Sequence, residues 1–408
     1  MTGGQIGNVD LVKQLNSAAV YSVIDQQGPI SRIQVADASQ LAPASVTKIT
    51  RQLMQRGLIK EVAQQASTGG RRAISLKTEV SLFHSIAIRL GRDYIHLSLF
   101  DLGAVELASY NSSFIYSNQT ELESGLLQHI QHFLEHQSET INQLIAIGIV
   151  LPGLINPEEG IVDYIPNTDV DNFELVDAVK RTFNVECFIG NDIRGRALAE
   201  YYFGASQDAS DSILVSVHNG TGAGIIVNGQ VFLGSNRNVG EIGHIQIDPL
   251  GAQCQCGNYG CLETVASNPA ILQGIRSRLS KGYPSSLATL ADITISDVCQ
   301  HALHDDELAK QSLIRVGNDL GKAIAITINL FNPQKIVIAG DITQASELLI
   351  PAIRRNIEAQ SLTRFHTNLP IVVSELENKP TIGAFSMIKR AMLNGVLLQK
   401  LLEPSIIT

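Results

Sequence analysis

Residues 241–263 of the chain read Glu-Ile-Gly-His-Ile-Gln-Ile-Asp-Pro-Leu-Gly-Ala-Gln-Cys-Gln-Cys-Gly-Asn-Tyr-Gly-Cys-Leu-Glu. This segment places one imidazole and three thiols close together, at His244, Cys254, Cys256 and Cys261. These are the donors of a tetrahedral zinc site, and four protein ligands fill the coordination shell. The segment therefore predicts one structural Zn²⁺ per chain rather than a hydrolytic ion. The alternative, three free thiols, is uncommon at this spacing.

The rest of the composition is that of an ordinary globular protein. The chain has 408 residues, of which 44% are hydrophobic and 17% charged. This balance supports a large core, and the length predicts two or three packed units. With five Cys, three of them in the segment above, we expect no disulfide framework. Since neither a secretory signal nor an apolar stretch of bilayer length is evident, we expect a cytoplasmic protein without stable membrane insertion.

Charge is distributed unevenly along the chain. Residues 1–77 contain nine Lys or Arg and four Asp or Glu, a balance of +5, although the whole chain carries −9. The remaining residues contain 21 basic and 35 acidic side chains. A basic N-terminal part on an acidic body indicates that only this part meets a polyanion.

Residues 1–80, called the head below, have the pattern of a winged helix-turn-helix. The predicted elements are helices over Val12–Asp25, Arg32–Gln40 and Pro43–Arg56 and strands over Leu58–Val62 and Ala73–Leu76. Two short helices, a tight turn and a hairpin with a basic tip are typical of DNA-binding domains. The residues expected to contact double-stranded operator DNA are Arg32, Ala44, Ser45, Thr47, Lys48, Arg51, Gly70, Arg71 and Arg72. The alternative is a trihelical module that binds another protein, but the positive charge favours DNA.

From residue 81 the pattern changes to alternating strands and helices. Three strand-like segments are followed by helix, strand, helix and strand, and the order begins again near residue 212. Periodicity alone indicates an α/β class, and the duplicated order is typical of a two-lobed actin-like (ribonuclease H-like) ATPase fold. The expected domains are the winged helix-turn-helix (1–80), a first lobe (81–191 plus 378–408), and a second lobe with zinc and the oligomerisation surface (192–377).

The C-terminal segment predicts one amphipathic helix over Ala384–Leu402. Such a helix most often closes a domain, and here we expect it to return to the first lobe. The alternative is a regulatory or membrane-facing element.

These motifs resemble the ROK family, which contains transcriptional repressors and sugar kinases. Residues 241–263 are similar to the family signature, and the head resembles that of the repressor branch, so the resemblance covers the whole chain. In the family's kinases an Asn-Asp pair and later Glu and His residues contact the sugar. The resemblance therefore implies sugar contacts at Asn191, Asp192, Glu241, His244 and Glu263. One ring nitrogen of His244 could bind zinc while the other faces the ligand.

The first lobe departs from the kinase pattern. Family kinases open this lobe with Asp-x-Gly-Gly-Thr, whereas the matching stretch here begins at Arg89 and ends at Asp93. A guanidinium has replaced the carboxylate that serves magnesium, and an acid stands in place of the threonine. A second glycine-rich stretch, Gly220–Gly224, looks intact as a phosphate loop, with a simple β-turn as the alternative. These departures predict a regulator that is not an enzyme and whose body is a former sugar kinase.

The resemblance also implies a ligand and partners. We expect an oligomer, a homodimer or tetramer, that represses genes of sugar uptake and metabolism and releases DNA when a sugar binds. Arg89 and Arg194 could recognise a sugar phosphate such as N-acetylglucosamine 6-phosphate, or could be surface charges. Two rivals remain: a glucose repressor controlled by a subunit of a sugar phosphotransferase system, and an active sugar kinase.

Overall fold

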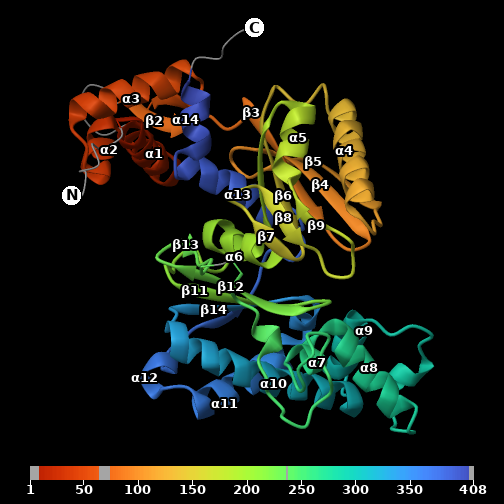
Figure 1. The fold of residues 1–408 in the computed structure, drawn as a ribbon. Coiled ribbons are helices and arrows are strands. Elements are labelled where there is room, and N and C mark those ends of the chain that lie inside the picture. The colour runs from red at the N-terminus through yellow and green to blue at the C-terminus, as the bar shows by residue number, and fades with distance from the viewer. Residues whose placement is uncertain (1–8, 64–73, 236–237, 404–408) are drawn as a thin grey trace, which may run out of the picture. The chain divides into compact units, whose positions relative to one another are not determined.

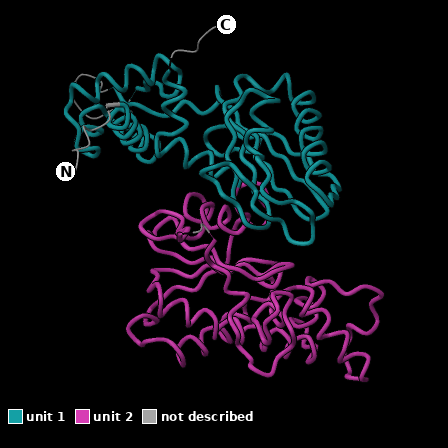
Figure 2. The backbone as a smooth tube through the Cα atoms, viewed as in Figure 1, with its two compact units in different colours: residues 1–190, 384–408 teal, residues 191–383 magenta. Residues whose placement is uncertain are grey.

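The computed structural model describes residues 9–63, 74–235 and 238–403. The chain divides into two compact units, residues 1–190 with 384–408 and residues 191–383 (Figure 2). The head and the first lobe belong to one unit, and the second lobe forms the other. The division into three functional domains stays a prediction. Among the described residues, no helix has both the length and the apolarity needed to cross a membrane.

The head contains the expected three helices and strand pair. Its elements are α1 (Val9–Gln27), α2 (Arg32–Ser39), α3 (Pro43–Gln55), β1 (Ile59–Ala63) and β2 (Ile74–Thr78). Ser31 caps α2 with a capping box, and Pro43 occupies the first turn of α3. The strands pair antiparallel, with Ile59 opposite Thr78. The expected tip residues Gly70, Arg71 and Arg72 lie outside the described residues.

The first lobe is built on a five-stranded sheet in the order β10-β6-β3-β4-β5. Its strands are β3 (Phe83–Leu90), β4 (Tyr94–Asp101), β5 (Glu106–Ser113), β6 (Gln143–Leu151) and β10 (Glu186–Asn191). The helices α4 (Gln119–His136) and α5 (Leu175–Phe183) lie beside this sheet (Figure 1), and their apolar side chains complete its core. A small three-stranded sheet, which the sequence did not predict, consists of β7 (Leu154–Asn156), β8 (Ile161–Tyr164) and β9 (Asp171–Phe173).

The second lobe repeats this strand order in the sheet β13-β12-β11-β14-β15. Its strands are β11 (Ser212–Val217), β12 (Thr221–Val227), β13 (Gln230–Val231), β14 (Lys335–Ala339) and β15 (Ile371–Val373). The helices of this unit are α6 (Asp192–Phe203), α7 (Glu263–Ala266), α8 (Asn268–Leu279), α9 (Ile295–Leu303), α10 (Glu307–Phe331), α11 (Ser346–Gln360) and α12 (Thr363–His366). Short 3-10 turns occur at Ile242–His244, Ser286–Thr289 and Asp341–Ala345. In both sheets an antiparallel three-stranded meander joins parallel strands, so the duplicated order expected from the sequence is present.

The prediction of one C-terminal helix is wrong. The segment forms α13 (Ile382–Leu393) and α14 (Val396–Leu402), separated at Gly395, whose φ is +88°. This left-handed conformation suits glycine and interrupts the helical repeat. The helix α13 packs in the first lobe as expected, where Phe385 stacks on Phe100. The helix α14 instead packs against α1 of the head (Figure 1).

Candidate functional site

Four metal-binding side chains converge in the Cys/His loop, residues 244–261. One nitrogen of His244 and the sulfurs of Cys254, Cys256 and Cys261 all lie within 4.8 Å of one another. The distance from His244 Nδ1 to Cys254 Sγ is 3.6 Å, and from Cys256 Sγ to Cys261 Sγ it is 3.7 Å. Two sulfurs each bound at about 2.3 Å to a tetrahedral zinc ion stand roughly 3.8 Å apart. The cluster could therefore hold a metal ion.

The backbone of the loop explains how the thiols meet. Gly257 and Gly260 have φ values of +93° and +67°. A Cβ on Gly260 would stand 1.5 Å from the carbonyl oxygen of Asp248, so only glycine fits there. A backbone hydrogen bond at Asn258 lowers the pKa of Cys256 to about 7. Burial raises the pKa of Cys261 to about 12, so this thiol needs a nearby positive charge to ionise at neutral pH.

Strand β12 brings the expected sugar-contacting segments together. The Ala223 N–H donates to the carbonyl of Gly240 at 2.7 Å, which fixes the segment that leads to Glu241. The Thr221 N–H donates to Glu263 Oε2 at 3.0 Å, which fixes the carboxylate that follows the last cysteine. On the other side, α6 packs against β12. The segments that carry Asp192, Glu241, His244 and Glu263 are thus held by one strand and its neighbours. These four residues are called the β12 cluster below.

The glycine-rich stretch expected as a phosphate loop, Gly220–Gly224, contains the end of a turn and the start of a strand. Thr221–Val227 is strand β12, so Gly222 and Gly224 lie in a strand and not in a loop. A Cβ on Gly222 would stand 2.6 Å from Ile193 Cδ1, and one on Gly224 would stand 2.4 Å from Ala197 Cβ. These two glycines allow α6 to approach β12 closely. Close packing thus accounts for these two glycines, and the phosphate loop stays a prediction.

Asn191 and Asp192 lie at the start of α6. Asn191 is the N-cap, and its Oδ1 accepts from the backbone N–H groups of Ile193 and Arg194. Asp192 Oδ1 also accepts from Ile193 N–H, at 2.9 Å. The cap fixes the backbone on which the Asp192 carboxylate stands.

Arg194 is buried, with 7% of its surface exposed, so its interpretation as a surface charge is wrong. Its Nη2 donates to the carbonyl of Val239 at 3.0 Å and lies 3.8 Å from Glu241 Oε1. Burial lowers its pKa, although the carboxylates of Glu241 and Asp192 act against that shift. Its Nε has no hydrogen-bond partner among the described residues. Arg194 thus fixes the segment before Glu241. Its buried Nε–H is a hydrogen-bond donor that could bind a ligand.

Sequence reasoning missed a second ionic group of the same unit. Arg196 Nη1 donates to Glu377 Oε1 at 2.6 Å and lies 3.1 Å from His218 Nε2. The Gly340 N–H also donates to Glu377, at 2.8 Å. Burial works to raise the pKa of Glu377, but Arg196 outweighs it and lowers that pKa. These residues are far apart in sequence and share no motif, so only the fold brings them together.

The altered turn of the first lobe carries no comparable cluster in the part of the chain that is described. Arg89 lies over the ring of Tyr94, with 5.9 Å between the guanidinium carbon and the ring centroid. Asp93 is exposed at the turn between β3 and β4. A cation–π contact thus engages Arg89, the residue expected to stand in place of the acid of the kinase motif.

The described part of the head offers an exposed basic and polar face on α3. Ala44, Thr47, Lys48 and Arg51 are exposed, and Ser45 is half-buried. The opposite side of α3 is buried through Val46, Ile49, Thr50 and Leu53. Arg32 differs, because its Nη2 pairs with Glu61 Oε1 at 2.7 Å inside the head.

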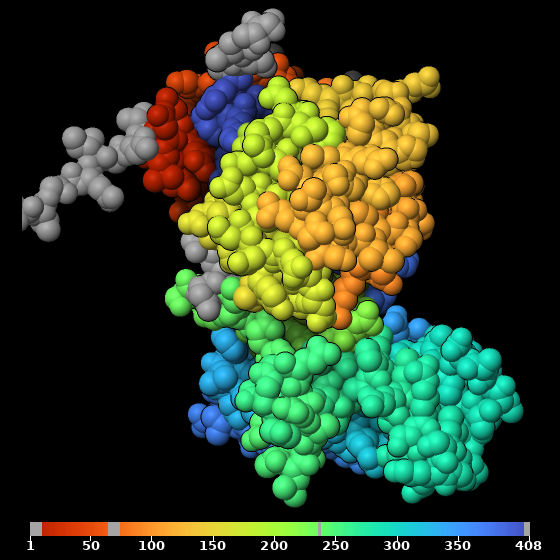
Figure 3. Space-filling model, turned by 45° about the vertical axis from the view of Figure 1, so that its right-hand side comes forward, coloured from red at the N-terminus to blue at the C-terminus, as the bar shows by residue number. Residues whose placement is uncertain are grey.

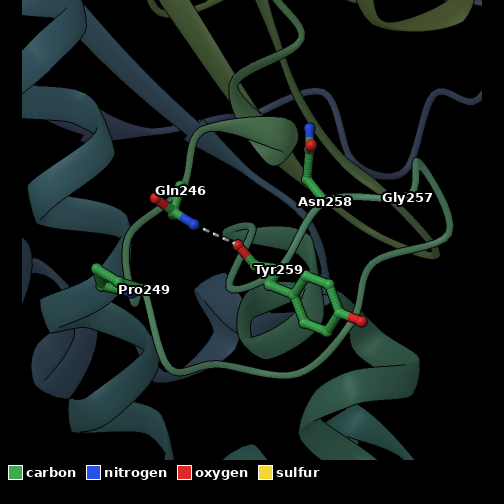
Figure 4. Close-up of a pocket in the computed structure, with 5 residues that line it drawn as sticks. All are labelled: Gln246, Pro249, Gly257, Asn258 and Tyr259. Carbon is green, nitrogen blue, oxygen red and sulfur yellow. Dashed lines mark hydrogen bonds between the residues drawn. The ribbon is translucent and has the colours of Figure 1, made fainter.

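An open hollow of about 520 Å³ lies on the Cys/His loop (Figure 4). It is lined by Gln246, Pro249, Gly257, Asn258 and Tyr259. Gln246 Nε2 donates to the carbonyl of Tyr259 at 2.9 Å, which closes the loop beneath the hollow. None of the expected sugar-contacting side chains lines it, so it is separate from the β12 cluster.

Together, the duplicated sheets, the Cys/His loop and the β12 cluster define a class of protein. The sequence profile of the ROK family matches residues 85–391, and the chain belongs to this family. It is 59% identical over 399 residues to the "DNA-binding transcriptional dual regulator NagC" of Escherichia coli K12, covering 98% of each chain. It is 37% identical over 401 residues to the "DNA-binding transcriptional repressor Mlc" of the same strain, again covering 98% of each. A crystal structure of a ROK family transcriptional regulator, a homologue of E. coli Mlc, matches with a TM-score of 0.91 and 43% identity, covering 97% of this chain and 100% of that one.

Proposed function

We propose that the protein is a sugar-responsive, DNA-binding transcriptional regulator of genes for sugar uptake and metabolism. The observation that carries the proposal is the 59% identity to NagC, because it extends over head and body alike. The protein acts in the cytoplasm, where its operator DNA lies. It is a repressor and not a sugar kinase, since the relatives are regulators and the first-lobe acid has become Arg89.

The head is the DNA-binding part, a winged helix-turn-helix. Its α3 would enter the major groove with Ala44, Ser45, Thr47, Lys48 and Arg51 toward the duplex. The exposure of Lys48 and Arg51 and the burial of the opposite face support this orientation. Arg32 keeps its role as an expected contact only if it leaves Glu61. A homodimer or tetramer would pair two heads on a palindromic operator.

The body is the sensor, with an actin-like two-lobed fold. Asn191, Asp192, Glu241, His244 and Glu263 would bind the sugar hydroxyls. The ion in the Cys/His loop would be a structural Zn²⁺, since three thiolates and one imidazole are the ligands that zinc prefers. His244 Nδ1 faces the cysteines, which leaves Nε2 as the atom toward the ligand.

The ligand is an amino-sugar phosphate, for which N-acetylglucosamine 6-phosphate is the first candidate. Relatives of 59% identity in other strains carry the name N-acetylglucosamine repressor, which supports the amino sugar. The unpartnered Nε of buried Arg194 supports the phosphate, because guanidinium donors bind phosphate oxygens strongly.

DNA binding by the head is tested with fluorescence polarisation on a pool of promoter fragments. Arg51→Ala should weaken binding to the selected fragment by about 5- to 150-fold, as expected for loss of a base or phosphate contact worth about 1–3 kcal/mol. The control Arg355→Ala removes an exposed arginine of α11 in the second lobe and should leave binding unchanged. Equal binding by wild type and Arg51→Ala would contradict the assignment of α3.

A coupled assay for ADP release with several hexoses tests the kinase alternative. We expect no turnover above the rate without sugar. Turnover that depends on sugar would contradict the proposed function.

A further inference from the structure

The described part of the head shares its apolar core with the C-terminus of the chain. The cluster that contains Tyr21 of α1 and Leu53 of α3 also contains Ile388, Met392 and Leu398. The last three residues lie on α13 and α14, more than 300 residues further along the chain. Figure 3 shows the blue surface of α14 between the head and residues of the first lobe. The head therefore depends on the C-terminal helices for its packing.

Polar contacts join the same elements. Ser22 Oγ donates to the carbonyl of Leu393 at 3.2 Å, at the end of α13. Arg56 Nη2 donates to the carbonyl of Leu402 at 3.3 Å, at the end of α14. These donors come from α1 and from the residue that follows α3, so the C-terminal ends of both α13 and α14 are fixed to the head.

An ion pair between Lys389 and Asp25 lies within this junction. The Lys389 Nζ–Asp25 Oδ1 distance is 2.7 Å, and the side chains are only 12% and 13% exposed. A buried pair adds little net stability, because desolvation offsets much of the attraction, but loss of either partner leaves an uncompensated charge. The pair therefore selects one register of α13 on α1.

The other end of α13 is fixed where the chain enters unit 1, at residue 384. A Cβ on Gly148 of β6 would stand 2.5 Å from the carbonyl oxygen of Ala384, so the strand and the helix start are in close contact. Phe385 stacks on Phe100 of β4, with 4.8 Å between ring centroids. One helix thus extends from the boundary with the sugar-binding unit to the ion pair in the head.

We propose that α13, with its Lys389–Asp25 ion pair, is the relay that passes the effector state of the second unit to the DNA-binding head. Lys389 and Asp25 are positioning residues, since neither belongs to the expected DNA or sugar contacts. A packed helix moves as a rigid body, so a displacement at residue 384 reaches Asp25. The inference rests on the proposed function, because it needs an effector in one unit and a reader in the other.

The test is hydrogen–deuterium exchange of the full chain with and without N-acetylglucosamine 6-phosphate, with calorimetry of ligand binding for each variant. In wild type the ligand should change exchange in α1 and α14 together. In Lys389→Met and Asp25→Asn the ligand should bind with unchanged affinity, while its effect on α1 falls about fivefold or more, the lower end of typical allosteric factors. The matched control is Lys400→Met, since Lys400 of α14 pairs with Glu186 of the first lobe.

The outcomes distinguish a relay from a staple, that is, from an ion pair that only stabilises the fold. A staple would lower the unfolding temperature of Lys389→Met but leave the ligand effect on α1 at its wild-type size, which would overturn the proposal. Absence of calorimetric binding by wild type would contradict the proposed ligand instead. In that case the exchange measurement is repeated with a bound promoter fragment in place of the sugar. Because coupling between two sites is reciprocal, DNA bound to the head should affect α13. DNA should then change exchange in α13 of wild type but not of Lys389→Met, and no change in wild type would overturn the relay.

Discussion

The two sheets share one strand order but differ at the turn that follows their first strand. In the first lobe this turn lies between β3 and β4, where Arg89 packs over Tyr94 and Asp93 is exposed. In the second lobe it lies between β11 and β12, where the Thr221 N–H holds the Glu263 carboxylate. At equivalent turns, the second lobe therefore positions a carboxylate through a hydrogen bond, whereas the first lobe has a contact between a guanidinium and an aromatic ring. Two copies of one fold can therefore carry different groups at equivalent turns, because function depends on the site and not on the fold.

The largest expected effect is loss of the metal from the second lobe. Cys261→Ser should reduce bound zinc from one ion per chain to none and weaken effector binding by about 10- to 100-fold, because the proposed metal would hold the loop that carries His244. Zinc analysis and calorimetry measure both effects. Cys299→Ser, a buried thiol outside the cluster, should retain the ion. One full zinc ion in Cys261→Ser would contradict the ligand set.

At the start of α6 we expect a loss of sugar binding of similar size, but without loss of the metal. Asp192→Asn keeps the shape of the side chain but removes a charged acceptor, which should weaken sugar binding by about 10- to 100-fold, equivalent to roughly 1.5–3 kcal/mol. Calorimetry with N-acetylglucosamine measures the change. Asp292→Asn alters an exposed carboxylate of the same unit and should bind as wild type does. Unchanged affinity in Asp192→Asn would place the sugar elsewhere.

Substitution of Arg194 in the second lobe and of Arg89 in the first should affect ligand affinity differently. Arg194→Ala should weaken binding of N-acetylglucosamine 6-phosphate about tenfold more than that of N-acetylglucosamine, because a charge-assisted hydrogen bond to the phosphate is lost. Arg89→Ala should leave both affinities within about twofold, since the half-buried Arg89 contacts the ring of Tyr94 in the first lobe. Equal losses for the two ligands in Arg194→Ala would make it a positioning residue for Glu241 alone.

The smallest effect concerns the pH dependence of stability in the second unit. The pKa of Glu377 lies below its ordinary value of 4.5 because of Arg196, so its stabilising effect is present above that value and is lost as the pH falls through the folded-state pKa. Urea unfolding should show wild type more stable than Glu377→Gln at pH 7. The difference should shrink below about pH 4.5. A difference that stays constant down to pH 3 would show that Glu377 does not act through its charge.

The sequence predicted local features well where one residue type has one physical meaning. The helix starts at Arg32 and Pro43 in the head were predicted correctly, and the cysteine spacing located the Cys/His loop. It was less decisive where one residue type has two meanings. Gly222 and Gly224 fit the pattern of a phosphate loop, and the structure shows that they also allow α6 to approach β12 closely.

Contacts between distant segments could not be predicted from spacing at all. Glu377 reaches Arg196, and Lys389 reaches Asp25, only because the fold brings the segments together. The break at Gly395 was missed because the apolar pattern of α13 continues into α14.

The central claim is that a sugar bound by the body controls the affinity of the head for DNA. The most direct test is fluorescence polarisation with the promoter fragment that binds best, repeated with N-acetylglucosamine 6-phosphate, N-acetylglucosamine and glucose. We predict specific binding that N-acetylglucosamine 6-phosphate weakens by about 5- to 150-fold, a coupling of about 1–3 kcal/mol. Specific binding unaffected by all three would contradict control by these sugars and indicate a protein inducer, such as a phosphotransferase-system subunit. No sequence-specific binding at low salt would contradict the claim itself.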